Sequence, residues 1–165
     1  MSSLQLNISS LAKESVSICA EKNVTFGTAE SCTGGLISAF VTDVAGASAV
    51  FFGGIVSYDN SIKEKLLGVR AKTLAEKGAV SPETALEMSH GALLALGVDL
   101  AVAVTGIAGP GGGTDKKPVG LVYISVASQK GALVTENHFS GNRESVRLQT
   151  AEKALSLLIA EAQRL

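Results

Sequence analysis

A serine hydroxyl and a cysteine thiol stand side by side before two glycines in the segment TAESCTGG, residues 28–35. Strand-forming residues precede this segment at 24–26, and apolar residues with helical spacing follow it at 36–41. We therefore expect Ser31 at the entrance of a helix, where unpaired backbone N–H groups can bind an anion or stabilise an oxyanion. We interpret Ser31 as the leading nucleophile. Cys32 is its rival, because a helix entrance lowers the pKa of a thiol.

A serine nucleophile needs a base that removes its proton, and Lys63 is the better candidate than either of the two histidines. A short helix is expected over residues 60–67, and Lys63 falls in its first turn, where the macrodipole and partial burial both lower a lysine pKa. From spacing alone, a solvated helix lysine like Lys65 is the commoner case. Tyr58, just before this helix, could relay a proton or orient the lysine, although a tyrosine at such a position is more often a half-buried strand residue.

A glycine-rich loop over residues 106–118 follows a continuous apolar run. Its glycines let backbone amides approach an oxyanion closely, but it matches neither a P-loop nor a dinucleotide-binding fingerprint. Arg143 and Arg147 are candidates for contacts with a phosphate or carboxylate, although exposed arginines that solvate a helix are common. No group of cysteines, histidines and carboxylates has metal-ligand spacing. We therefore expect neither a metal nor a cofactor.

The elements that position these residues alternate between strands and helices. The apolar run at 99–105 is typical of a central strand covered on both faces. Helix starts and stops are indicated by capping residues, proline and glycine. The pattern predicts a single domain over residues 1–165, an α/β fold with three α/β/α layers around a mixed sheet. Helices are expected over about 4–21, from near 33 to 45, and over 60–67, 82–96 and 143–164; strands are expected over 24–26, 50–58, 99–105, 120–126 and 132–139.

The composition excludes several classes of partner. A net charge of −1, 4% aromatic residues and no tryptophan argue against nucleic acid. No apolar run is long enough to span a bilayer, so we expect no membrane partner. The first residues lack the pattern of a secretory signal, which predicts a cytoplasmic protein. Cys19 and Cys32 are expected to be free thiols.

Six segments of the chain, in order, resemble the C-terminal domain of the competence/damage-inducible protein CinA. Stand-alone members of that family include nicotinamide-nucleotide amidases, and the resemblance is to this short, single-domain form. The matching segments are AESCTGG at 29–35, GIVSY at 54–58 with Asn60 and Lys63, LGV at 67–69, AVS at 79–81, TGIAGPGG at 105–112 and FSGNR at 139–143.

The resemblance implies hydrolysis of the carboxamide of nicotinamide mononucleotide to nicotinate mononucleotide and ammonia. It implies that Ser31 attacks the amide, that Lys63 acts as base and then as proton donor to ammonia, and that Tyr58 supports this transfer. A homo-oligomer is also expected. The positions carried over as substrate-binding are Gly34 and Gly35, whose N–H groups would serve the oxyanion, and Ser48, Thr105, Gly106, Gly109, Gly111 and Arg143.

Two alternatives stand beside this interpretation. A non-catalytic nucleotide-binding or interaction module could use the same glycine loop without needing Ser31 or Lys63. An amidase could also act through Cys32 in place of the serine. The joint presence of Ser31, Tyr58 and Lys63 favours the serine enzyme, because a binding module has no chemical need for all three.

Overall fold

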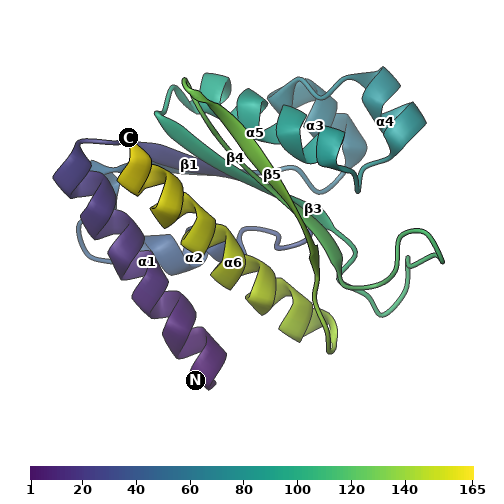
Figure 1. Ribbon diagram of the computed structural model, residues 1–165, viewed down its shortest axis with the longest axis horizontal. Coiled ribbons are helices and arrows are strands. Elements are labelled where there is room, and N and C mark those ends of the chain that lie inside the picture. Colours follow the sequence, from purple (N-terminus) through teal and green to yellow (C-terminus); the bar gives the residue numbers. More distant parts are fainter.

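A five-stranded mixed sheet lies between two layers of helices in the computed structural model, which describes residues 1–165 (Figure 1). The strand order is β2-β1-β3-β4-β5. The first three of these strands run parallel, and β4 and β5 form an antiparallel hairpin at one edge. This confirms the predicted three-layer α/β fold around a mixed sheet. The strands are β1 (Phe26–Glu30), β2 (Phe51–Val56), β3 (Leu100–Gly106), β4 (Leu121–Ser128) and β5 (Gly131–His138).

The helices divide between the two faces of the sheet (Figure 1). One layer contains α1 (Ser3–Lys22), α2 (Leu36–Thr42) and α6 (Arg143–Arg164), which pack on one another and on the sheet. The other contains α3 (Asn60–Leu67), α4 (Ala71–Lys77) and α5 (Pro82–Leu96), with α5 lying directly on β3 and β4. None of these helices has both the length and the apolar character needed to cross a membrane.

Each face of the sheet has its own apolar core. The larger core has 25 buried residues and lies under α1, α2 and α6, whereas the smaller core has 9 and lies under α5. The strand β3 contributes to both, with Val102 in the larger core and Ala101 and Ala103 in the smaller one. Alternate side chains of a strand point to opposite faces, so a strand covered on both sides reads as the continuous apolar run seen in the sequence.

The main differences from the predicted elements fall at the first strand and the helix after it. β1 begins at Phe26 and continues to Glu30, so residues 27–30, which were expected to lie between the strand and the helix, belong to a strand paired on both sides. The helix α2 begins at Leu36, not near residue 33, because Gly34 and Gly35 have positive φ and form a turn. The sequence also did not predict α4 or the 3-10 turn at Ala47–Ala49, both of which lack a side-chain cap.

The topology gathers the candidate residues at one edge of the sheet. Carboxyl ends of parallel strands share an edge, and ligands bind there in open α/β sheets. Ser31 directly follows β1, Tyr58 is the second residue after β2, and Thr105 lies next to the last residue of β3. Residues far apart in the chain therefore meet in one place.

Candidate active site

Lys63 and Ser31 are in direct contact at the carboxyl ends of the parallel strands. The Lys63 Nζ lies 3.0 Å from the Ser31 Oγ and donates to the main-chain carbonyls of Ser57 (2.8 Å) and Tyr58 (3.2 Å). The lysine side chain is only 1% exposed and forms no ion pair. Burial lowers the pKa of Lys63, against a smaller opposing effect of Asp59. The pair therefore has the geometry of a nucleophile beside a base that burial brings toward its neutral form.

The helix α3 presents the lysine to the serine. The Asp59 side chain caps α3 by accepting hydrogen bonds from the Ser61 N–H (2.9 Å) and hydroxyl (2.5 Å). Lys63 follows one turn later on the buried face, whereas Lys65 on the same helix is exposed. The alternative of a solvated Lys63 is therefore wrong.

A buried carboxylate fixes the turn that carries Ser31. Glu30 is fully buried at the end of β1, and its two oxygens accept hydrogen bonds from five donors between residues 33 and 38. Three are backbone N–H groups in or next to the first turn of α2, where a negative charge is stabilised by the helix dipole. The donors are the Thr33 hydroxyl (2.7 Å), the N–H groups of Gly35 (3.0 Å), Ile37 (3.1 Å) and Ser38 (2.9 Å), and the Ser38 hydroxyl (2.7 Å).

This arrangement corrects the expectation that Gly34 and Gly35 donate to an oxyanion. The Gly35 N–H is bonded to Glu30, and the Gly34 N–H donates to the Ser31 carbonyl at 3.1 Å. Neither glycine lines the cleft described below. The Cys32 N–H, by contrast, has no main-chain acceptor, and Cys32 lines the cleft next to the nucleophile. The N–H that follows a nucleophile is the donor that an oxyanion hole uses in α/β hydrolases.

A cleft of about 280 Å³ opens over the Ser31–Lys63 pair. Most of the predicted site residues share it: Ser31, Tyr58, Lys63, Thr105, Gly106, Gly109, Gly111 and Arg143. Ser48 does not. It lies exposed in a separate hollow beside Phe51 and Phe52, because the 3-10 turn that carries it precedes the opposite, amino end of β2.

The glycine loop forms the wall of the cleft opposite the serine. The N–H groups of Ala108, Gly109, Gly111 and Gly112 all lack an acceptor within the protein, and all four residues line the cleft. Backbone amides without partners next to a cleft can serve an anionic ligand. Thr105 has a different role: its hydroxyl donates to the Ala79 carbonyl at 2.7 Å and fastens the neighbouring segment 78–81 to the sheet.

Arg143 and Tyr58 meet at the rim of the cleft. The Arg143 guanidinium donates to the Gly109 carbonyl through Nη1 (2.8 Å) and to the Tyr58 hydroxyl through Nη2 (3.1 Å). Tyr58 thus contacts Lys63 through its carbonyl and Arg143 through its hydroxyl. Arg147, the other arginine considered from the sequence, donates to the Thr33 carbonyl at 2.7 Å and helps to hold the serine turn.

The structure weakens the case for Cys32 as the nucleophile. Its side chain is buried, and this burial raises the pKa of the thiol to about 12. The helix entrance does not lower that pKa as expected, because the Glu30 carboxylate already occupies the entrance and opposes a second negative charge. Burial likewise raises the pKa of Cys19 to about 11, and both cysteines are free thiols as predicted.

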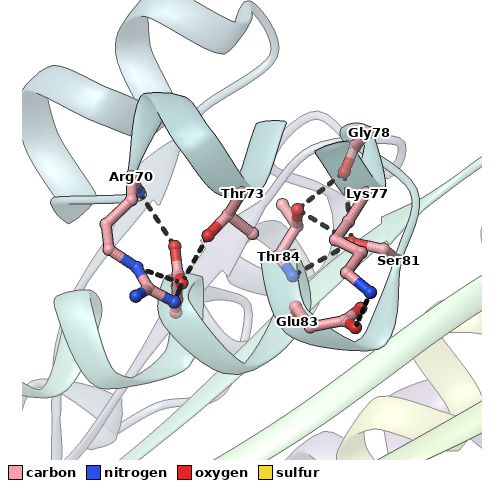
Figure 2. A network of polar contacts seen from close by, with 8 residues as sticks. Arg70, Thr73, Lys77, Gly78, Ser81, Glu83 and Thr84 are labelled. Carbon is pink, nitrogen blue, oxygen red and sulfur yellow. Dashed lines mark hydrogen bonds and ion pairs between the residues drawn. The ribbon is translucent and has the colours of Figure 1, made fainter. Parts of the chain in front are cut away.

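The remaining wall of the cleft, formed by Ala79 and Val80, was not predicted from the sequence. Figure 2 shows the polar network that holds the chain on either side of it. The Glu87 carboxylate binds the guanidinium and N–H of Arg70 and the hydroxyl of Thr73, which fixes α4 against α5. The hydroxyls of Ser81 and Thr84 both donate to the Gly78 carbonyl, at 3.1 and 2.7 Å.

Comparison with protein families identifies a match over nearly the whole chain. The family model of the CinA C-terminal domain matches residues 8–162. A CinA-like protein of Leptospira interrogans is 54% identical over 146 residues, which is 88% of this chain and 35% of that protein. A CinA-like protein of Geobacter sulfurreducens is 55% identical over 138 residues, 84% of this chain and 33% of that protein. The chain thus spans about a third of the length of these curated relatives.

Solved structures of similar length share the fold. The competence/damage inducible protein CihA of Agrobacterium tumefaciens is 46% identical with a TM-score of 0.91, over 93% of this chain and 94% of that one. A CinA superfamily protein of Klebsiella pneumoniae is 32% identical with a TM-score of 0.92, over 96% of this chain and 99% of that one. These names refer to competence and damage induction and state no reaction.

Proposed function

Because the chain belongs to the CinA C-terminal domain family, we propose that it is a nicotinamide-nucleotide amidase, which hydrolyses the carboxamide of nicotinamide mononucleotide. One observation carries the proposal: the Ser31 Oγ and the buried Lys63 Nζ lie 3.0 Å apart at the floor of a cleft. A pure binding site has no need of a buried lysine that lacks a carboxylate partner, since burying an ammonium is costly.

The contacts of the lysine fit a neutral amine. A neutral amine has two N–H donors and one lone pair, and the carbonyls of Ser57 and Tyr58 take two donors. The lone pair then faces the Ser31 hydroxyl. In the proposed first step, Lys63 accepts the hydroxyl proton while Ser31 Oγ bonds to the amide carbon. The Cys32 N–H supports the oxyanion that forms.

The second half of the reaction returns that proton. The lysine, now an ammonium, donates it to the departing nitrogen, the C–N bond breaks and ammonia leaves an acyl ester on Ser31. Water then attacks the ester with Lys63 as base, the bond from the carbonyl carbon to the Ser31 Oγ breaks, and Lys63 passes the water proton to that oxygen as nicotinate mononucleotide leaves. Lys63 thus carries every proton that is transferred, and no metal is required in this sequence of steps.

The other wall of the cleft suits the phosphate of the substrate. Arg143 supplies a cation, and the free N–H groups of Gly111 and Gly112 supply hydrogen bonds. Arginine and backbone amides are the groups that bind phosphate in many proteins. We propose that the nicotinamide ring enters first and that the phosphate stays at the rim.

The test is ammonia release from nicotinamide mononucleotide by the wild type, Ser31→Ala and Lys63→Met, with Lys65→Met as the matched control on the exposed face of α3. Loss of the nucleophile should lower kcat at least about 10³-fold, and loss of the base about 10²- to 10⁴-fold. Lys65→Met should keep full activity. Circular dichroism establishes that each variant is folded.

The outcomes separate the candidate functions. A folded wild type that binds the mononucleotide without releasing ammonia would replace the enzyme by a nucleotide-binding module. Activity that survives Ser31→Ala and disappears in Cys32→Ala would transfer the nucleophile to the thiol, in spite of its raised pKa.

A further inference from the structure

Tyr58 contributes two groups to the cleft, and they contact different partners. Its main-chain carbonyl accepts from the Lys63 Nζ at 3.2 Å, whereas its hydroxyl accepts from the Arg143 Nη2 at 3.1 Å. The side chain is 62% exposed and extends toward the rim. Only the carbonyl, which any residue at this position would supply, contacts the catalytic pair.

The Lys63 amine has no hydrogen or lone pair left for a hydrogen bond with the Tyr58 hydroxyl. Its three polar contacts are the Ser57 carbonyl, the Tyr58 carbonyl and the Ser31 hydroxyl. A neutral amine makes three such contacts through two hydrogens and one lone pair, and an ammonium makes three through its hydrogens. In both protonation states the lysine is fully engaged.

Arg143, in contrast, depends on Tyr58 for its position. Its guanidinium forms no ion pair, and its two acceptors are the neutral Gly109 carbonyl and Tyr58 hydroxyl. These contacts hold the ends of the planar group between the glycine loop and the end of β2. An arginine side chain has many rotamers, so a second acceptor restricts the directions in which its charge can point.

We infer that Tyr58 is a positioning residue for the anionic end of the substrate: its hydroxyl holds the Arg143 guanidinium at the rim of the cleft and takes no part in proton transfer. This inference rests on the proposed function, in which that anionic end is the phosphate of the mononucleotide. It gives Tyr58 a role in substrate recognition, where the family resemblance implies support of the proton transfer.

The experiment compares two substrates and the two tyrosines of the chain. Tyr58→Phe keeps the carbonyl and the ring and removes only the hydroxyl. Tyr123→Phe is the matched control, since the Tyr123 hydroxyl donates to Glu136 outside the cleft. Nicotinamide mononucleotide carries the phosphate and nicotinamide riboside lacks it. Steady-state kcat and KM are measured for each combination.

For the mononucleotide, Tyr58→Phe should raise KM roughly fivefold to tenfold, the equivalent of one hydrogen bond, and leave kcat within about twofold. With the riboside, Tyr58→Phe and wild type should have equal kcat/KM. Tyr123→Phe should match the wild type on both. A fall in kcat of similar size on both substrates would instead place the hydroxyl in the proton transfer and overturn the inference.

A binding measurement keeps this test separate from that of the proposed function. The mononucleotide is titrated calorimetrically into Ser31→Ala, with and without Tyr58→Phe, and the pair is repeated in an Arg143→Met background. Tyr58→Phe should weaken Kd roughly fivefold to tenfold with Arg143 present and have no effect without it, as expected of residues that act through one another. An unchanged Kd with Arg143 present would overturn the inference even if the wild type proves to be an active amidase. Absence of turnover with this coupling intact would overturn only the amidase.

Discussion

The two walls of the cleft differ in how completely their hydrogen bonds are satisfied within the protein. The serine wall, residues 30–38, is held by a buried carboxylate that binds five donors. The glycine wall, residues 106–113, lines the same cleft with four N–H groups that have no acceptor in the protein. Most polar groups of the serine wall, although not the Cys32 N–H, are occupied by the chain itself, whereas these four N–H groups of the glycine wall are left without a partner.

The difference fits the roles that we propose for the two walls. A nucleophile and its base must be held within a few tenths of an ångström, which requires neighbours locked by packing and hydrogen bonds. A wall that binds an anion needs donors that the protein does not use. The side chains of Ser31 and Lys63 are therefore buried, whereas Gly111 and Arg143 are exposed.

The largest expected effect is a loss of stability when the hydrogen bonds of the serine wall are removed. Glu30→Ala leaves several buried donors of the 33–38 turn unpaired, each costing about 1–3 kcal/mol, so the free energy of unfolding should fall by at least about 3 kcal/mol. Gly111→Ala is the control in the other wall: a methyl group there meets nothing within 4 Å and should change stability by less than about 0.5 kcal/mol. Urea denaturation measures both. Equal losses would mean that the two walls do not differ as described.

The pH dependence of the proposed reaction tests whether burial lowers the pKa of Lys63. Burial lowers the pKa of Lys63 from an ordinary value of 10.5, and the base acts in its neutral form. Below that lowered pKa, kcat/KM should rise about tenfold per pH unit, and it should level off before pH 10.5. A rate that keeps rising through pH 10.5 would show that Lys63 titrates like a solvated lysine.

The same shift has a consequence for stability, with a definite sign. Between the lowered pKa of folded Lys63 and 10.5, the unfolded chain binds more protons than the folded one. The free energy of unfolding should therefore rise with pH across this window and not below it. Lys63→Met removes that rise, and denaturation of both proteins at matched pH values measures the difference.

Thr105→Val examines the junction between the cleft and the layer of α4 and α5. The substitution keeps the shape of the side chain but leaves the Ala79 carbonyl without its hydroxyl donor at 2.7 Å. A loss of about 1 kcal/mol in the free energy of unfolding is expected, together with a modest rise in KM as residues 78–81 loosen. Thr105→Ser retains the donor and should recover most of both effects.

The sequence pattern predicted the layers of the fold, and the family resemblance implied the Ser31–Lys63 pair, but neither predicted what holds the pair in place. Apolar periodicity marks a buried strand, and the asparagine and aspartate before Lys63 mark a helix start. No comparable local sequence pattern indicates the role of Glu30. Its five donors at residues 33–38 come from a turn and the start of α2, whose path depends on glycines with positive φ and on the hydrogen bond from the Ser31 N–H to the Val104 carbonyl of β3, so its role exists only in three dimensions.

Tyr58 and Ser48 illustrate the same limit. The sequence indicates that Tyr58 lies near Lys63. It does not indicate whether the carbonyl or the hydroxyl of Tyr58 faces the lysine, because that depends on the course of the chain between β2 and α3. Ser48 was carried over from the family resemblance, yet its hollow lies near the amino end of β2, whereas the cleft lies at the carboxyl ends of the parallel strands. The resemblance implied a shared site that the topology of this chain does not form.

The smallest effect is expected in the polar network of Figure 2, whose residues lie outside the serine and glycine walls and do not line the cleft. Arg70 is 74% exposed, and its ion pair with Glu87 lies at the surface, where such pairs contribute about 0–1 kcal/mol. Arg70→Ala should therefore lower stability by less than about 1 kcal/mol and leave kcat and KM unchanged. Thr73 keeps its own hydrogen bond to Glu87, which still fastens α4 to α5. A clear rise in KM for Arg70→Ala would instead mean that α4 helps to position residues 78–81, which line the cleft at Ala79 and Val80.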